Sequence, residues 1–274
     1  MEKHFCLDDS PMFRMIELDE VDSTNNFLRH LDTPGDNRMT LVTAEFQTAG
    51  RGADTNHWES AKGENLLLSL RVMPSNLPAR RMFAISEVAA LAVRESLTSP
   101  LPAPPLGECL NPAERGSGEG VFSIKWPNDI YFGDSKVAGI LIENDLQGAL
   151  VQRSTIGIGI NINQRHFLSD APNPRSLADI VGHDVERRFV LEQFMESFTH
   201  YMQQIDEGKK DALDTLHEEY KKSLYRRGEE HTYSDKDGTF RATLTDVEPT
   251  GHLILQDTEG KQRRYEFKEV KYEI

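Results

Sequence analysis

The sequence contains few cysteines and no long hydrophobic run, and both absences restrict the class of protein. Only two cysteines occur, and Cys6 and Cys109 have the spacing of neither a metal site nor a disulfide framework. No apolar run approaches the roughly 20 residues needed to cross a bilayer. The segment Met1–Glu20 mixes charged with apolar side chains, unlike a signal peptide. We therefore expect a protein of the reducing cytoplasm with no membrane partner.

Positive charge is also scarce, because the formal net charge at pH 7 is −14. Binding of nucleic acid requires a basic surface, so we expect no nucleic-acid partner. The pairs Lys209-Lys210, Lys221-Lys222 and Arg226-Arg227 stand among acidic residues and are interpreted as solvated helix faces. No G-x-x-x-x-G-K-[ST] motif occurs, which excludes a P-loop nucleotidase. An acidic protein that binds an anion must concentrate cations locally, so cations within apolar segments are the informative ones.

The periodicity of apolar residues predicts helices and strands in one chain. We expect helices at 23–31 and 79–97 and two more within 191–224, separated near Gly208. The expected strands are 40–46, 65–72, 121–126, 136–144 and 154–163.

Two regions depart from this pattern. The proline- and glycine-rich stretch 99–120 predicts an exposed excursion. Short alternating strands from 231 to 274, separated by glycine turns, predict a small β-barrel after a domain boundary near residues 223–228.

Positively charged residues stand within or next to apolar segments at three places in the sequence. Gly50-Arg51-Gly52 sets an arginine between residues that permit close backbone approach, and the planar guanidinium suits a phosphate or carboxylate. A turn with a surface arginine is the alternative. Lys125 ends an apolar strand before the turn Trp126-Pro127-Asn128-Asp129, and Lys136 precedes the next apolar strand. The two lysines could hold a polyanion, or they could simply extend into solvent at strand ends.

Small and polar residues in two other segments could also line a ligand site. Gly157 and Gly159 within an apolar strand indicate close approach by a ligand or another part of the chain. Asn161 and Asn163 follow with amide donors and acceptors. Ser23-Thr24-Asn25 can cap a helix, and a helix N-terminus also attracts anions. Tight packing of the strand beneath a helix is the alternative explanation for the glycines.

In their order along the chain, these segments resemble the biotin–protein ligases over residues 15–274. The matching text is DSTN at 22–25, QTAGRG at 47–52, Trp58, KWPND at 125–129, KVAGIL at 136–141 and GIGININ at 157–163. The resemblance implies an α+β fold: a mixed sheet with helices on one face, related to the class II aminoacyl-tRNA synthetase core, then an SH3-like barrel. We expect a catalytic domain at 1–225, with 99–120 as an insertion, and the barrel at 226–274.

The resemblance also implies a role for each matching residue. On the biotin side, Ser23, Thr24 and Gln47 would bind the ureido ring, and Asn25 would support that helix start. The loop that closes over biotin and the phosphates would comprise Gly50, Arg51, Gly52 and Ala53. On the nucleotide side, Lys136 would lie near the biotin carboxylate and α-phosphate. The remaining expected contacts around the nucleotide, its metal and the adenylate are Lys125, Asn128, Asp129, Gly139, Asn161 and Trp58.

The implied reaction joins two anions. Biotin's carboxylate attacks the α-phosphorus of ATP, and Arg51, Lys125 and Lys136, with Mg²⁺, would offset the repulsion. A lysine of a biotin carboxyl carrier domain then takes the biotinyl group. Asp129 would orient the metal or the lysines, and it is the one candidate metal ligand.

The sequence departs from the family pattern after Gly52. The family continues with basic or polar residues and a glycine, whereas Ala53 and Asp54 follow here. We therefore hypothesise that biotinyl-adenylate is released faster from this protein than from relatives with a basic loop. The chain also begins at the catalytic domain, so we expect a ligase without the DNA-binding domain of the bifunctional type. Lipoate–protein ligase and a non-catalytic biotin-binding protein are the alternatives, and both a monomer and a homodimer are compatible with the sequence.

Overall fold

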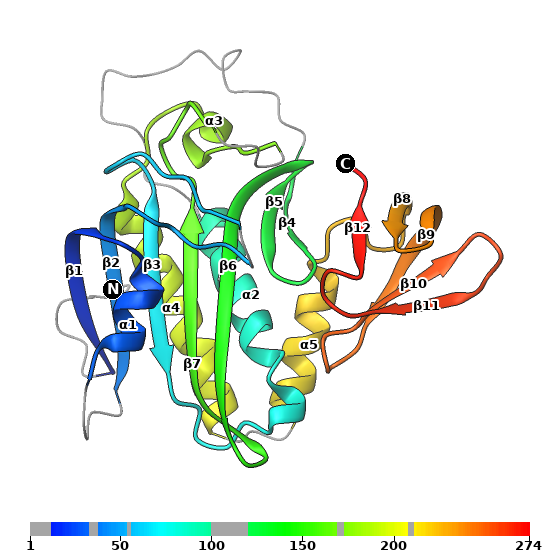
Figure 1. Ribbon diagram of the computed structural model, residues 1–274, viewed down its shortest axis with the longest axis horizontal. Helices are drawn as coiled ribbons and strands as arrows, with labels where there is room; N and C mark the ends of the chain where they lie inside the picture. The colour runs from blue at the N-terminus through cyan, green and yellow to red at the C-terminus, as the bar shows by residue number, and fades with distance from the viewer. Residues whose placement is uncertain (1–11, 33–37, 54–55, 100–119, 169–172, 208–210) are drawn as a thin grey trace.

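The protein has two β-sheets, seen in a computed structural model that describes residues 12–32, 38–53, 56–99, 120–168, 173–207 and 211–274 (Figure 1). A seven-stranded sheet comes first in the chain and a five-stranded sheet follows it. The chain contains helices as well as these two sheets, so the predicted α+β class is confirmed. The predicted excursion at 99–120 lies almost wholly outside the described residues.

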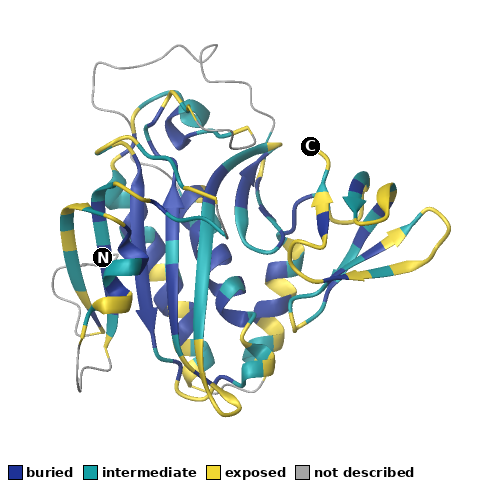
Figure 2. Ribbon diagram, in the orientation of Figure 1, coloured by how far each residue is buried: buried dark blue, intermediate teal, exposed yellow. Residues whose placement is uncertain are grey.

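The seven-stranded sheet is mixed, with the order β1-β2-β3-β7-β6-β5-β4. The pair β1 and β2 is parallel, and the other pairs are antiparallel. Every residue of β3 is buried, as its sequence LLLSLRV requires of a strand covered on both faces (Figure 2). The strands are β1 (Phe13–Val21), β2 (Met39–Gln47), β3 (Leu66–Val72), β4 (Phe122–Lys125), β5 (Asp129–Phe132), β6 (Ser135–Gln147) and β7 (Leu150–Ile160).

Helices cover both faces of this sheet, which differs from the expected single helical face. Three long helices pack together behind it: α2 (Ala84–Thr98), α4 (Arg187–Asp206) and α5 (Ala212–Lys222) (Figure 1). The short helix α1 (Thr24–His30) lies on the opposite face, against β3 and β7. Two small elements, η1 (Ala79–Arg81) and α3 (Leu177–Val181), complete this part of the chain.

Helix α1 is short, and its surroundings rather than its length hold it in place. Leu28 is fully buried beneath it. Arg71 of β3 donates to the backbone oxygens of Leu28 and Leu31, so a cation satisfies the carbonyls at the helix C-terminus. The start of α1, at Ser23 and Thr24, is thereby fixed over the centre of the sheet.

The five-stranded sheet is antiparallel, with the order β11-β10-β9-β8-β12. No pairing of β11 with β12 occurs among the described strands, so the predicted closed barrel is not confirmed. Trp126 Nε1 donates to the oxygen of Gly251 over 2.9 Å, which ties this sheet to the first. Its strands are β8 (Glu230–Asp235), β9 (Gly238–Val247), β10 (Leu253–Asp257), β11 (Gln262–Tyr265) and β12 (Val270–Tyr272).

Most predicted elements lie where the sequence places them, with three omissions and two helices whose first residue differs from the prediction. The strands β1 and β5 and the helix α3 were not predicted. The helix predicted at 79–97 begins only at Ala84, because η1 and a turn precede it. The first helix predicted within 191–224 is α4, which starts earlier, at Arg187. None of the described helices is long and apolar enough to span a membrane.

Candidate functional site

A cavity of about 870 Å³ lies between the face of the large sheet that carries α1, the start of that helix, the loop after β2 and the end of β12. A volume of this size suits a small molecule or two joined ones. Segments from both sheets contribute to its wall. The sequence-predicted residues that line it are Ser23, Thr24, Asn25, Gln47, Arg51, Gly52, Ala53, Trp58, Lys125, Asn128, Asp129, Lys136 and Gly139.

Glycines form the floor of the cavity, where β6 and β7 pair Gly139 with Gly159. A Cβ atom added to Gly159 would lie 2.3 Å from Trp58 Cε2, and one added to Gly139 would lie 2.8 Å from Trp58 Cζ3. At Gly157 the added atom would lie 2.4 Å from Asn25 Oδ1. Glycine is therefore required here because the indole and α1 approach the strands so closely.

The end of the cavity beside α1 presents neutral polar groups. Gln47 Oε1 accepts hydrogen bonds from the backbone nitrogen of Thr24 (2.8 Å) and from its hydroxyl (3.0 Å). Ser69 Oγ donates to Asn25 Oδ1 over 2.5 Å and lies 2.7 Å from Thr24 Oγ1. Ser23 occupies the N-cap position of α1, but its buried side chain makes no capping bond. Its hydroxyl therefore stays available to a ligand.

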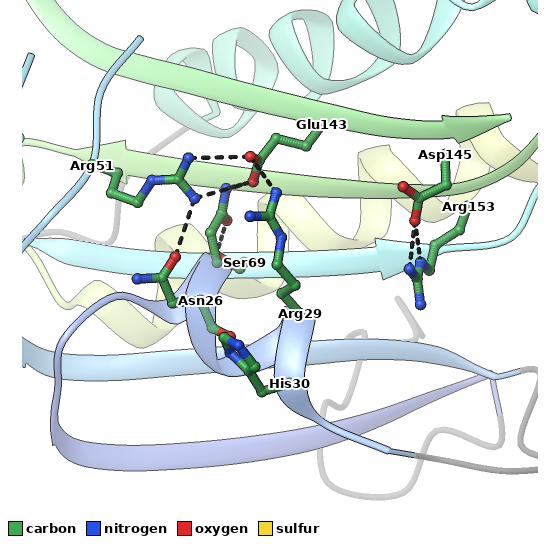
Figure 3. Close-up of polar contacts among 9 residues, drawn as sticks. Asn26, Arg29, His30, Arg51, Ser69, Glu143, Asp145 and Arg153 are labelled. Carbon is green, nitrogen blue, oxygen red and sulfur yellow. Dashed lines mark hydrogen bonds and ion pairs between the residues drawn. The ribbon is translucent and has the colours of Figure 1, made fainter. Parts of the chain in front are cut away.

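Arg51 enters the cavity wall in a cluster with Asn26, Arg29 and Glu143 (Figure 3). The guanidinium meets the carboxylate through two contacts, Nη2 to Oε1 at 3.1 Å and Nη1 to Oε2 at 3.3 Å. Nη1 also donates to Asn26 Oδ1 over 3.1 Å. Arg29 Nη2 reaches the same carboxylate at 2.7 Å. The Glu143 carboxylate thus forms ion pairs with two arginines, Arg29 of α1 and Arg51 of the loop after β2.

Lys136 and Asp129 form an ion pair at the other end, with Nζ 2.6 Å from Oδ2. The ammonium also lies 5.9 Å from the centre of the Trp58 ring. The indole Nε1 is buried and has no hydrogen-bond partner among the described residues. A buried donor without a partner in a cavity wall indicates a ligand acceptor at that position.

Lys125 lies deeper, between two tyrosine rings. Its Nζ donates to Tyr131 OH over 3.2 Å and lies 5.0 Å from the centre of that ring. The ring of Tyr272, from β12, is 5.3 Å away on another side. Burial lowers the pKa of the Lys125 ammonium below its usual value, and the nearby Asp129 carboxylate opposes that shift. Part of the surroundings of this cation therefore comes from the second sheet.

The cavity concentrates positive charge on an otherwise acidic chain with a net charge of −14. Asp129 is the single carboxylate among the described lining residues. A site of this composition attracts anions through its local field although the whole molecule repels them. The cationic lining residues are Arg51, Lys125, Lys136, Lys268 and Lys271.

Two predicted residues do not line the cavity. Gly50 lies beneath Trp58, and a Cβ atom there would come within 2.6 Å of the Trp58 backbone oxygen. Asn161 is buried just past the end of β7, where its Nδ2 donates to the oxygen of Arg175 over 3.4 Å. Both residues support neighbouring segments of the site from behind.

Several residues of the site were not predicted. Ser69 and Glu143 do not line the cavity themselves but contact residues that do, Thr24 and Asn25 for Ser69 and Arg51 for Glu143. Strand register puts them there, because it pairs Ser69 with Gly157 and Glu143 with Thr155. Lys268, Lys271 and Tyr272 reach it only because the second sheet docks there. Glu143 stands two positions after the end of KVAGIL in the sequence, and this position was the one available signal.

Comparison with known proteins agrees with this geometry. Residues 18–161 match the biotin/lipoate A/B protein ligase family. The biotin–[acetyl-CoA-carboxylase] ligase of Paracoccus denitrificans is 29% identical over 250 residues, which cover 89% of this chain and 95% of that protein. The bifunctional ligase/repressor BirA of Bacillus subtilis (strain 168) is 28% identical over 257 residues, or 92% of this chain and 72% of that protein.

A solved structure shows that the similarity extends through both sheets. The biotin protein ligase from Aquifex aeolicus in complex with biotin and ATP has a TM-score of 0.69 and 26% sequence identity, and covers 94% of this chain and 99% of that one. Because the family match spans more than half of the sequence, the assignment follows from it. The chain belongs to the biotin/lipoate A/B protein ligase family.

Proposed function

We propose that this protein is an ATP-dependent biotin–protein ligase, which forms biotinyl-5′-AMP and transfers biotin to a lysine of a biotin carboxyl carrier domain. The observation that carries the proposal is the convergence of Arg51, Lys125 and Lys136, from separate segments, on one cavity. A vitamin carboxylate and a nucleotide are both anions, and such a cavity can hold them together. The names of the similar proteins, which include biotin and ATP, support this substrate pair.

The two ends of the cavity suggest how the substrates lie. The neutral polar groups of Ser23, Thr24 and Gln47 suit the ureido ring of biotin, whose carbonyl accepts and whose N–H groups donate. Lys125 and Lys136 at the other end suit the phosphates. Biotin's carboxylate would then lie between the ends, where the two reactants must meet.

The first step forms a bond between a biotin carboxylate oxygen and the α-phosphorus of ATP, and the bond to pyrophosphate breaks. Arg51 and Lys136 would stabilise the charge that develops on the phosphoryl oxygens. Alignment of the two reactants in one cavity would supply much of the remaining rate enhancement.

In the second step, a neutral lysine amine of the acceptor attacks the biotinyl carbonyl carbon. AMP leaves, and the new amide nitrogen loses a proton to solvent.

Mg²⁺ fits this site only together with ATP. No cluster of three or more potential ligands occurs among the described residues. Asp129 accepts from Lys136 through Oδ2, which leaves Oδ1 for a cation, and Asn128 lines the cavity beside it. Magnesium is commonly held by one or two protein oxygens together with phosphates and water. Asp129 and Asn128 would therefore orient a magnesium ion that neutralises phosphate charge.

Incubation with ATP, Mg²⁺, biotin and a carrier domain tests the proposal through the mass of the carrier and the release of pyrophosphate. A gain of one biotinyl group is expected with biotin and no gain with lipoic acid. Modification by lipoate alone would favour the lipoate ligase alternative. Biotin binding without pyrophosphate release would favour the non-catalytic binder.

Lys136→Ala tests the assigned role of this lysine in the same assay. Because the variant removes a cation from the reaction centre, we expect the mass gain to disappear while the circular dichroism spectrum is unchanged. Modification at the normal rate by this variant would contradict the role given to Lys136.

We also propose the finer features that the resemblance implies. The catalytic domain would end near residues 223–228, between α5 and β8, and the five-stranded sheet would correspond to an SH3-like barrel. The expected cytoplasmic location and the choice between monomer and homodimer stay predictions.

A further inference from the structure

Glu143 is the anion that fixes the orientation of Arg51. Two N–H groups of the guanidinium meet its two carboxylate oxygens, at 3.1 and 3.3 Å. Such a two-point contact sets both the position and the plane of an arginine side chain, whereas a single contact leaves it free to rotate. Asn26 Oδ1 adds a third contact at 3.1 Å from the side of α1 (Figure 3).

The same carboxylate connects three segments of the site. Besides the loop that carries Arg51, it contacts Arg29 of α1 at 2.7 Å, and Asn25 Nδ2 lies 3.5 Å from it. The side chains of Glu143 and Arg51 are 26% and 34% exposed, so water screens this pair only in part. Glu143 thus joins β6, α1 and the loop at the edge of the cavity.

Arg51 still has donors to offer. A guanidinium carries five N–H groups, and the contacts with Glu143 and Asn26 use only the two terminal nitrogens. Nε–H and one Nη2–H have no partner in the part of the chain that the structure describes. Because Arg51 lines the cavity, these groups are available to an anion inside it.

We propose that Glu143 is a positioning residue of the ligase reaction, which holds Arg51 so that its remaining donors meet the reacting carboxylate and phosphate. This inference rests on the proposed function. Glu143 touches no substrate in this role and acts only through the arginine. The opposite role, competition with the substrates for Arg51, predicts the opposite sign when the carboxylate is neutralised.

Glu143→Gln is the variant that separates these roles, because it removes the charge and keeps the size of the side chain. Arg51 keeps its own charge, so attraction of ATP to the site should persist and KM for ATP should change less than about twofold. The loss of orientation should lower kcat for biotin-dependent pyrophosphate exchange by about tenfold. A rise in kcat/KM would overturn the proposal in favour of competition.

Asp145→Asn is the matched control. Asp145 lies on the same strand and pairs with Arg153, with Nη2 2.5 Å from Oδ2, outside the cavity lining (Figure 3). Its pair is more exposed, at 54% for the carboxylate and 41% for the arginine. Neutralising this carboxylate should leave kcat within about twofold of the parent protein, since exposed pairs contribute little. An equal loss in both variants would show a general effect of charge on the strand and would overturn the proposal.

A double-mutant cycle measures the coupling between Glu143 and Arg51 in the exchange reaction, which a purely structural role of Glu143 would not produce. If Glu143 acts through the arginine, Glu143→Gln should lower exchange no further in a protein that already carries Arg51→Ala. The same fold-loss in both backgrounds would contradict the proposal. Asn26→Ala removes the other described contact of the guanidinium and should show the same dependence on Arg51, so the test does not depend on one variant folding.

The parent protein separates failure of this inference from failure of the proposed function. Absence of biotin-dependent exchange in the parent would refute the ligase assignment itself. Normal exchange in the parent and in a folded Glu143→Gln variant would refute only the role of Glu143. Thermal melts and biotin binding by calorimetry establish folding for each variant.

Discussion

Gly159→Ala adds one methyl group to the cavity floor and should displace the indole of Trp58. The new Cβ would lie 2.3 Å from Trp58 Cε2 and 2.5 Å from Nε1, whereas ordinary contacts begin at 3.4 Å. The ring must therefore withdraw by roughly 1 Å to restore normal packing. Misplacement of a binding group by about 1 Å can reduce a rate by about 100-fold, equivalent to about 2.7 kcal/mol.

Stability should change little in this variant. Trp58 follows a loop and can move outward, and alanine is favoured over glycine in a strand by about 0.5–1 kcal/mol. We expect the melting temperature to stay within a few degrees of the parent value, about 2–4 °C for each kcal/mol. A large loss of activity with an intact fold is the expected combination.

Pyrophosphate exchange and intrinsic fluorescence together measure this effect. Only two tryptophans occur in the chain, and Trp126 is 5% exposed and held by Gly251. A red-shifted emission in Gly159→Ala would therefore report movement of Trp58 into water.

The matched control is the same substitution in a Trp58→Ala background, where no ring remains to be displaced. Gly159→Ala should then have little further effect on exchange. If it has the same effect there, the methyl group obstructs the substrate directly and the reasoning about the indole is refuted.

Three further predictions concern charge. Lys125→Met should abolish exchange yet raise the melting temperature near pH 7, because it removes a buried ammonium whose pKa is lowered. That penalty is present while the ammonium is protonated and disappears as the pH rises through its lowered pKa toward the ordinary 10.5, so melts at alkaline pH should show a smaller difference. Glu87→Ala should destabilise the protein by about 2–4 kcal/mol in urea titrations, because it leaves a cavity and strips the buried His217 of its 2.5 Å partner; a change below about 1 kcal/mol would contradict this. Ala53→Arg should slow release of biotinyl-adenylate in a trapping assay by about fivefold, since it adds a charged donor beside the phosphate. Slow release from the parent protein would remove the basis of that last prediction.

Local sequence predicted the residues whose role depends on local geometry. The glycine at position 159 indicated a close contact from sequence alone, and a Cβ atom there would clash with the indole in its present position. Lys125 ends β4 and Lys136 lies at the start of β6, with only a turn and β5 between them, so local order along the chain brings both to one cavity. The lysine-containing motifs were informative for this reason.

Other residues of the site could not be predicted from local sequence, because their positions depend on the register between strands and on the packing of the two sheets. Ser69 contacts Thr24 and Asn25 at the start of α1 because β3 pairs with β7 at Gly157. A shift by one residue would turn its side chain to the other face of the sheet. Similarly, Tyr272 contacts Lys125 only because the two sheets dock, and no pattern within β12 specifies that contact.

The missed strands have a different cause. β1 is an edge strand whose side chains are mostly intermediate or exposed, so its hydrophobic alternation is weak. β5 has only four residues and directly follows a proline turn. The weak alternation of β1 and the shortness of β5, whose last three residues are buried, left no period to recognise in either strand.

The Lys125 ammonium lies between an aromatic ring of β5 and one of β12, so its surroundings depend on how the two sheets are packed together. Withdrawal of β12 would let water reach Lys125 and return its proton affinity toward that of a free lysine. The packing of β12 against the first sheet and the pKa of Lys125 are therefore linked, and a substitution in β12 that loosens this packing should raise that pKa.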